Sequence, residues 1–167
     1  MTAINTTKTS AKDRDLILTR LIDASPDKVF QAWTDPELLK QWFAPLPWTT
    51  PIVEADVRAG GKSLIVMRSP DATDYPYEGV YLEVVKNQRL VFTNAYTKAW
   101  EPAAKPFTTV ILTFEPHAGM TKYTALVRHW NVADREAHEK MGFHQGWPIC
   151  TEQLAALVER RGDASPG

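Results

Sequence analysis

Residues 133–160, ADREAHEKMGFHQGWPICTEQLAALVER, form the stretch that decides the fold. Their apolar members recur at spacings of three and four, which is typical of the buried side of an α-helix: Phe143, Trp147, Cys150, Leu154 and Leu157. Charged residues lie largely off this stripe. Pro148 removes one amide and crowds the carbonyl of His144, so we expect a kink near Gly146. The segment predicts a long amphipathic helix that must cover another apolar surface.

Segments of alternating polarity precede this helix, and a period of two is typical of β-strands. Short turns and one longer Pro-containing loop at 97–106 separate residues 52–58, 64–67, 77–85, 89–96, 107–114 and 122–130. Consecutive strands joined by short turns pair antiparallel. An earlier segment, residues 15–22, carries apolar side chains on both faces. We therefore predict an antiparallel sheet of about seven strands.

Two short helices are expected directly after the first strand. Residues 25–27 (Ser-Pro-Asp) and 35–37 (Asp-Pro-Glu) each give a helix start, with a capping side chain, proline at the first helical position and an acid near the positive end of the dipole. Val29, Phe30 and Trp33 form the buried side of the first helix. The second helix is expected to end near Trp42, because prolines follow it.

The order of these elements predicts an α+β architecture. A curved antiparallel sheet cannot close a core alone, so the long helix must lie across its concave face while the two short helices close one end. Such packing leaves a gap wherever facing side chains fail to meet. We expect a flexible lead-in at residues 1–12, one domain at residues 13–161 and a frayed tail at residues 162–167.

Composition and charge exclude several functional classes. The 19 Lys and Arg against 20 Asp and Glu give a net charge of -1, which supplies no general attraction for nucleic acid. Cys150 is the one cysteine, so no intramolecular disulfide forms. The sequence shows neither a signal peptide at its start nor an apolar run of the roughly 18 residues that suggest a membrane span. We expect a cytoplasmic protein that does not enter a membrane.

Sequence motifs for catalysis or metal binding are weak. Residues 58–63 resemble the end of a phosphate-binding loop, but a strand follows them where that motif needs a helix, so a turn is expected. His138 and His144 stand six apart on the predicted helix and cannot share a metal. Cys150 lies on the apolar stripe, where a thiol usually acts as a small hydrophobic group. We predict no metal site and no cofactor.

His129 is the polar residue of greatest interest. It shares the parity of Tyr123, Ala125 and Val127 on the last strand, so it points toward the helix if that face is concave. Two interpretations stay open: a core histidine bonded to a neighbour, or an anchor for the polar end of a ligand. Aromatic residues on the long helix are ambiguous in the same way, because they suit both a core and a cavity wall.

Several stretches resemble one protein family. They are residues 22–26 (IDASP), 29–37 (VFQAWTDPE), 42–45 (WFAP), 56–61 (DVRAGG), 79–83 (GVYLE), 89–93 (RLVFT) and 146–147 (GW). Together they resemble the bacterial homologues of the heat-shock protein 90 ATPase activator, a branch of the START-like (SRPBCC) superfamily that includes polyketide cyclases. The resemblance implies the helix-grip fold, with a cavity beneath the long helix that binds apolar ligands.

These observations predict a protein that binds an apolar or aromatic small molecule between the sheet and the long helix. The predicted wall residues come from the second short helix, the sheet and the long helix: Trp42, Phe43, Met67, Tyr81, Phe92, Phe143, Trp147 and Cys150. His129 is the predicted polar anchor. Polyketide cyclase-like or hydrolase-like catalysis with His129 or Tyr81 as acid or base is one alternative, and a chaperone-accessory role is another. Trp100 is the kind of residue that a homodimer contact uses.

Overall fold

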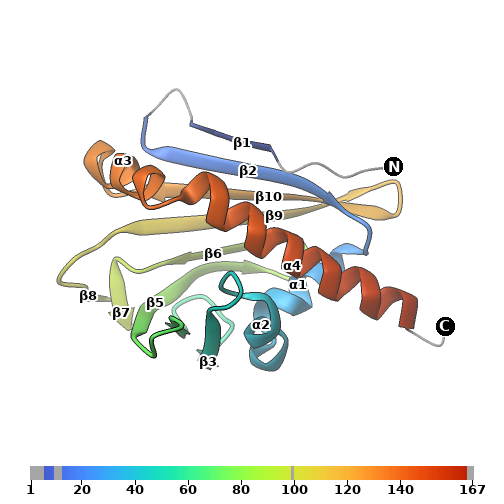
Figure 1. Cartoon of the computed structure of the whole chain (residues 1–167), viewed down its shortest axis with the longest axis horizontal. Helices are drawn as coiled ribbons and strands as arrows, with labels where there is room; N and C mark the ends of the chain where they lie inside the picture. The colour runs from blue at the N-terminus through green and yellow to red at the C-terminus, as the bar shows by residue number, and fades with distance from the viewer. Residues whose placement is uncertain (1–5, 10–12, 99, 165–167) are drawn as a thin grey trace.

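The computed structural model describes residues 6–9, 13–98 and 100–164 (Figure 1). It is an α+β structure built on one large antiparallel sheet. Eight strands follow one another across this sheet in the order β1 (Thr6–Thr9), β2 (Asp15–Ile22), β10 (Met120–His129), β9 (Thr108–His117), β6 (Arg89–Thr93), β5 (Asp74–Val85), β4 (Lys62–Arg68) and β3 (Thr49–Ala55). The predicted seven-stranded sheet is confirmed, and β1 adds an edge strand within the segment expected to be a lead-in.

Four helices complete the described chain. The short helices α1 (Pro26–Thr34) and α2 (Pro36–Trp42) follow β2 as predicted. In place of one C-terminal helix there are two, α3 (Val132–Lys140) and α4 (Phe143–Ala164). The chain breaks between them at Gly142, whose φ of 106° glycine tolerates far better than other residues. Pro148 lies inside α4, so the interruption comes before the expected kink at Gly146.

Helix starts at the two prolines are confirmed, but the two caps differ. Asp35 accepts a hydrogen bond from the Glu37 amide at 3.0 Å, as an N-cap side chain should. The Ser25 hydroxyl instead donates to the carboxylate of Asp27, and its side chain caps no amide. The amides of Lys28 and Val29 bond to the Ser25 carbonyl, and the predicted cap by the Ser25 side chain is not formed.

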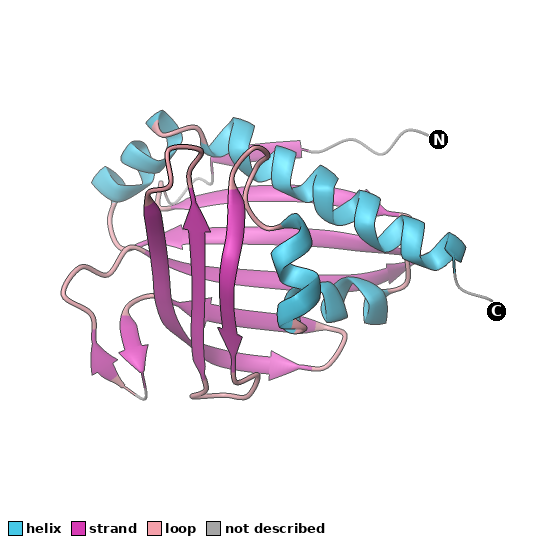
Figure 2. Ribbon diagram, turned by 60° about the horizontal axis from the view of Figure 1, so that its bottom comes forward, coloured by secondary structure: helices cyan, strands magenta, loops and turns pink. Residues whose placement is uncertain are grey.

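Sheet curvature creates the concave face that the helices cover. Figure 2 shows the strands of one half of the sheet turned steeply against those of the other half. A register shift between Tyr81 and Glu83 interrupts the pairing of β5 with β6, and bulges of this kind bend a sheet. In the loop between β6 and β9, which was expected to be irregular, β7 (Tyr96–Lys98) and β8 (Glu101–Pro102) form a small separate hairpin.

The C-terminal half of α4 is packed into the core against α1 and β2. Leu154 and Val158 are at most 1% exposed, as are Val29 of α1 and Leu18 of β2. A bidentate ion pair fastens the same region, because the buried guanidinium of Arg20 on β2 lies 2.7 and 2.8 Å from the Glu152 carboxylate of α4. The long helix therefore lies across the concave face of the sheet, as predicted (Figure 1).

The structure also bears on two further predictions, the turn before β4 and the lack of a membrane-spanning helix. Gly60, with φ at 83°, forms the predicted turn before strand β4, and a Cβ at Gly61 would stand 1.8 Å from the Asp56 carbonyl oxygen. Residues 58–61 therefore make the tight turn, and strand β4 follows from Lys62, where a phosphate-binding loop would lead into a helix. Among the described helices, none is long and apolar enough to cross a membrane.

Candidate functional site

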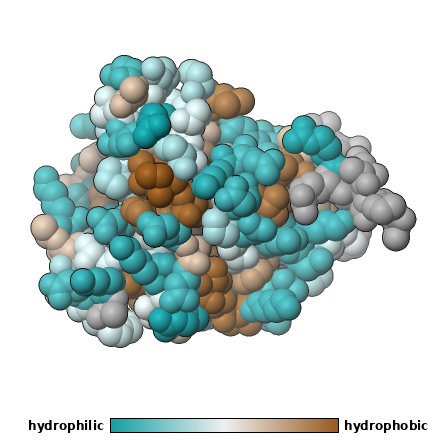
Figure 3. All heavy atoms as spheres, turned by 90° about the horizontal axis from the view of Figure 1, so that it is seen from below, coloured by the Kyte–Doolittle hydropathy of each residue, from teal (hydrophilic) through white to brown (hydrophobic). Residues whose placement is uncertain are grey.

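A cavity in two compartments lies between the N-terminal part of α4 and the sheet. Each compartment has a volume of about 230 Å³. The helix-side compartment borders α2 and α4, and the sheet-side compartment borders strands β4, β5, β6, β9 and β10. The two adjoin, since they share six wall residues: Trp33, Phe43, Met67, His138, Met141 and Trp147. Apolar residues also reach the surface in patches between hydrophilic ones, as Figure 3 shows for one face.

Aromatic packing shapes this cavity. Trp33 of α1 stands at its centre, 2% exposed, and its ring centroid lies 4.7 Å from that of Trp42 and 5.7 Å from that of Phe92. On α4, the rings of Phe143 and Trp147 pack 5.7 Å apart. Such rings are rigid and wide, and they leave space where their edges do not meet. The walls are therefore preformed and mostly apolar.

Most of the predicted wall residues line the two compartments. The helix-side compartment is bordered by Trp42, Phe43, Met67, Phe143, Trp147 and Cys150. Phe92 borders the sheet-side compartment. Tyr81 lies elsewhere, in a small gap of about 10 Å³ beneath Trp33, and is 4% exposed. His129 also lies outside both compartments and borders a separate pocket of about 150 Å³ beside Arg128 and Trp130.

Five polar residues line the compartments although the sequence did not predict them as wall residues: Tyr77, Thr108, Tyr123, His138 and Thr151. Tyr77 stands four residues before Tyr81 on β5, so a period of two places both on the same face of the strand, but only Tyr81 was predicted. Its hydroxyl lies 3.3 Å from that of Thr108. His138 comes from α3, a helix without a single buried residue, and sequence periodicity gave no sign that it faces a cavity.

Burial keeps the hydroxyl and thiol groups of the cavity neutral. It raises the pKa of Tyr77 to about 12 and that of Cys150 to about 11. The pKa of Tyr123 is likewise raised by burial, and its hydroxyl accepts a hydrogen bond from the Trp33 indole at 3.1 Å. At neutral pH these groups supply neither a base nor a thiolate nucleophile.

Two histidines form a polar chain at one end of the cavity. His129 is 1% exposed, and its Nδ1 lies 2.9 Å from the Arg14 carbonyl oxygen. Its Nε2 lies 2.8 Å from Nδ1 of His138, which borders both compartments. Burial lowers the pKa of both rings, that of His138 to about 4, where the neighbouring His129 adds to the effect. His129 thus acts on the cavity through His138.

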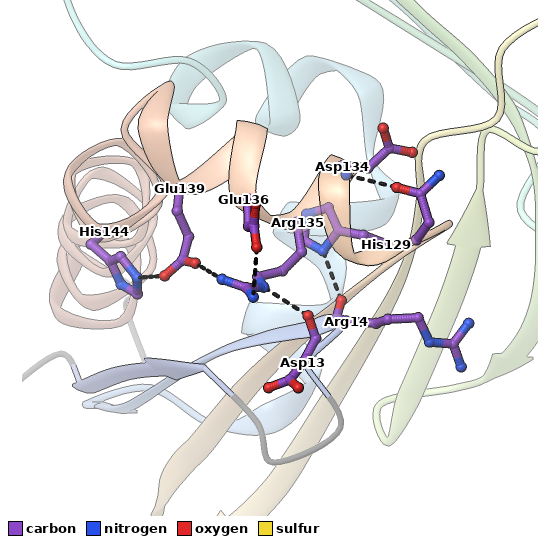
Figure 4. A network of polar contacts seen from close by, with 9 residues as sticks. Asp13, Arg14, His129, Asp134, Arg135, Glu136, Glu139 and His144 are labelled. Atoms are coloured by element: carbon purple, nitrogen blue, oxygen red, sulfur yellow. Dashed lines mark hydrogen bonds and ion pairs between the residues drawn. The ribbon is translucent and has the colours of Figure 1, made fainter.

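A network of ion pairs and hydrogen bonds positions α3 over this end of the cavity (Figure 4). Arg135 of α3 donates to the Asp13 carbonyl at 2.7 Å and pairs with Glu139. The Glu139 carboxylate also lies 2.8 Å from Nε2 of His144 on α4, whose Nδ1 is 2.7 Å from the Thr7 hydroxyl. These contacts cross the Gly142 break and tie both helices to β1 and to the residues just before β2. They hold His138 in place.

The site is therefore suited to holding an uncharged apolar group. In the described parts of the chain, no cluster of three or more His, Cys, Asp or Glu could hold a metal ion.

Comparison with known proteins agrees with this structure. A crystal structure of a protein from Nitrosomonas europaea shares 35% identity, with a TM-score of 0.88 over 92% of this chain and 99% of that one. Two further solved structures share the fold. The protein from Mycobacterium smegmatis has 22% identity and a TM-score of 0.79 over 93% of this chain and 97% of that one. The protein from Arthrobacter aurescens has 20% identity and a TM-score of 0.80 over 93% of this chain and 91% of that one. No curated protein matches. The model of the family described as Activator of Hsp90 ATPase homolog 1-like protein matches residues 23–159, and the chain belongs to that family.

Proposed function

We propose that the protein binds an apolar or aromatic small molecule in the two-compartment cavity. The observation that carries this proposal is a preformed space walled mainly by aromatic and aliphatic side chains, next to a core of buried apolar residues. Both compartments are partly open toward the surface, so a ligand can reach apolar walls that otherwise face water. A space of this size is therefore suited to an occupant, and it approaches the range of ligand pockets.

Apolar burial would supply most of the affinity. At about 25 cal/mol per Å², a ligand that buries roughly 250 Å² of apolar surface gains on the order of 6 kcal/mol before the costs of association. Charge contributes little, because the hydroxyl and thiol groups that line the cavity stay neutral near pH 7. Uncharged ligands should bind better than charged analogues of the same shape, since a charge would lose its hydration without gaining a partner.

A thermal-shift panel of fatty alcohols and polycyclic aromatics, each large enough to occupy both compartments, tests the proposal. Cys150→Phe adds a ring inside the helix-side compartment, while Ile149→Phe adds the same ring next to it at a site that is 48% exposed. Ligands should stabilise the wild type and Ile149→Phe but not Cys150→Phe. A panel that leaves wild-type melting unchanged, or shifts Cys150→Phe as much as the wild type, would refute binding in this cavity.

Catalysis in the same cavity is less well supported by the geometry. Tyr81 lies in a separate gap, and His129 reaches the cavity through His138. Turnover that survives both His129→Ala and Tyr81→Phe would remove these two residues from any catalytic role. A chaperone-accessory role would act through the surface, and a pull-down combined with an ATPase assay of the chaperone decides it independently of the cavity.

A further inference from the structure

The Arg14 carbonyl determines which nitrogen carries the proton in each of the two hydrogen-bonded histidines, His129 and His138. A carbonyl oxygen only accepts, so Nδ1 of His129, at 2.9 Å, must carry the proton of that hydrogen bond. A neutral imidazole carries one proton, which leaves a lone pair on Nε2 of His129. His138 then has to donate from its own Nδ1 across the 2.8 Å separation.

This arrangement fixes the state of the other nitrogen of His138. With its proton on Nδ1, the neutral ring presents a lone pair at Nε2, which is a hydrogen-bond acceptor. Burial favours the neutral form of both rings, although Asp134, Asp15 and Arg135 also act on His129 electrostatically. Within the described ranges, Nε2 of His138 makes no hydrogen bond, while the ring itself borders both compartments.

Other polar groups in the cavity are already engaged. The hydroxyls of Tyr77 and Thr108 bond to each other, and that of Tyr123 accepts from Trp33. The Thr151 hydroxyl donates to the Trp147 carbonyl. The thiol of Cys150 is a weak donor and a weak acceptor. An occupant that brings a hydroxyl or N–H group meets an imidazole nitrogen with an unused lone pair, on a ring that lies between the aromatic rings of Phe107 and Phe143.

We propose that the cavity selects apolar aromatic ligands that carry a hydrogen-bond donor, such as phenols, and that this donor bonds to Nε2 of His138. This inference rests on the proposed function and names its ligand class. His138 is the specificity-determining residue, and His129 is a positioning residue that holds the accepting tautomer. The donor group meets His138 while the aromatic body fills the space beside Trp33 and Trp147.

Two probes of nearly equal shape test the selection: 2-naphthol, which carries a donor, and 2-methylnaphthalene, which does not. Their dissociation constants are measured for the wild type, for His138→Phe, and for His117→Phe as a control on an exposed hairpin. The preference for 2-naphthol should fall roughly tenfold in His138→Phe, because the buried hydroxyl loses its acceptor. It should not change in His117→Phe.

Failure of the two proposals can be told apart. If neither probe binds the wild type, the proposed function fails for this ligand class and the inference fails with it. If both probes bind but His138→Phe keeps the full preference for 2-naphthol, the inference alone is overturned. A second measurement needs no variant: ¹⁵N NMR of the free protein at pH 7 should show Nε2 of His138 unprotonated, and a protonated Nε2 would refute the proposal.

Discussion

Alanine at Gly142 and alanine at Gly146 should change stability in opposite directions, although both sites lie near the start of α4. At Gly142 the backbone φ is 106°, which residues with a side chain rarely adopt. The nearest atom to an added Cβ there is Oε1 of Gln145, at 3.5 Å. The cost of Gly142→Ala is therefore backbone strain, not a clash. At Gly146, inside the helix, an added Cβ meets nothing within 4 Å, so Gly146→Ala gains helix propensity without a steric cost.

The magnitudes follow from these two environments. Backbone strain at Gly142 should cost about 1–3 kcal/mol. Alanine also lowers the entropy of the unfolded chain, which stabilises the folded state by about 0.4–1 kcal/mol, so the free energy of unfolding should fall by about 1–2 kcal/mol in total. Gly146→Ala should gain about 0.5–1 kcal/mol. The two variants should thus differ by about 2 kcal/mol. In a domain of this size that separates their melting temperatures by about 6 °C.

Urea unfolding followed by tryptophan fluorescence measures both free energies, with circular dichroism as a check of the fold. Because the Gly142 break positions His138 and Met141 over the cavity, Gly142→Ala should also weaken binding of 2-naphthol. A Gly142→Ala variant as stable as the wild type would show that the backbone there is free to relax. The assigned helix break would then be wrong, and so would the placement of His138 that depends on it.

Three further predictions concern polar groups that are partly or fully buried. Tyr123→Phe should destabilise the protein by about 1–2 kcal/mol in urea unfolding, because the Trp33 indole loses its acceptor; retained stability would show that the indole finds another. Because burial raises the pKa of the Cys150 thiol to about 11, its alkylation by iodoacetamide at pH 8 should be roughly a hundredfold slower than that of free cysteine. A rate close to that of free cysteine would contradict this. Burial lowers the pKa of His138 from 6.5 to about 4, so the unfolded chain binds more protons than the folded one between these pH values. Stability should therefore fall by about 2.5 kcal/mol as pH drops from 6.5 to 4. His138→Phe should flatten that slope in urea titrations, and an unchanged slope would assign it to other groups.

Much of the fold could be predicted because several local signals agree. Prolines with neighbouring acids marked the starts of α1 and α2, and a period of two marked seven strands. Strand β1 gave no such signal, since Thr6–Thr9 is polar and its pairing with β2 is visible only in three dimensions. The break at Gly142 was hidden because glycine is tolerated inside helices as well as at their ends. Pro148 was the more conspicuous disruption, yet it lies within α4.

The candidate site was harder to predict. The alternation of residues in a strand and the apolar side of a helix show which face is buried, but not where along that face a cavity lies. Tyr77 and Tyr81 share one face of β5, and only the placement of Trp33 separates the residue that borders the cavity from the one sealed beneath it. The same difficulty applies to His129 and His138. The strand pattern drew attention to His129, whereas the histidine that borders the cavity lies on a helix with no buried residues. The contact between the two rings follows from no sequence spacing.

Differences between the two halves of α4 explain why the cavity lies where it does. In the C-terminal half, Leu154, Ala155 and Val158 are almost completely buried and fill the space against the core. In the N-terminal half, Gly146 and Cys150 stand one helical turn apart and border the helix-side compartment. Gly146 has no side chain and Cys150 has a short one, so neither fills the space beside it, while the rings of Phe143 and Trp147 form the wall around that space. The same helix therefore closes the core at one end and keeps a cavity open at the other.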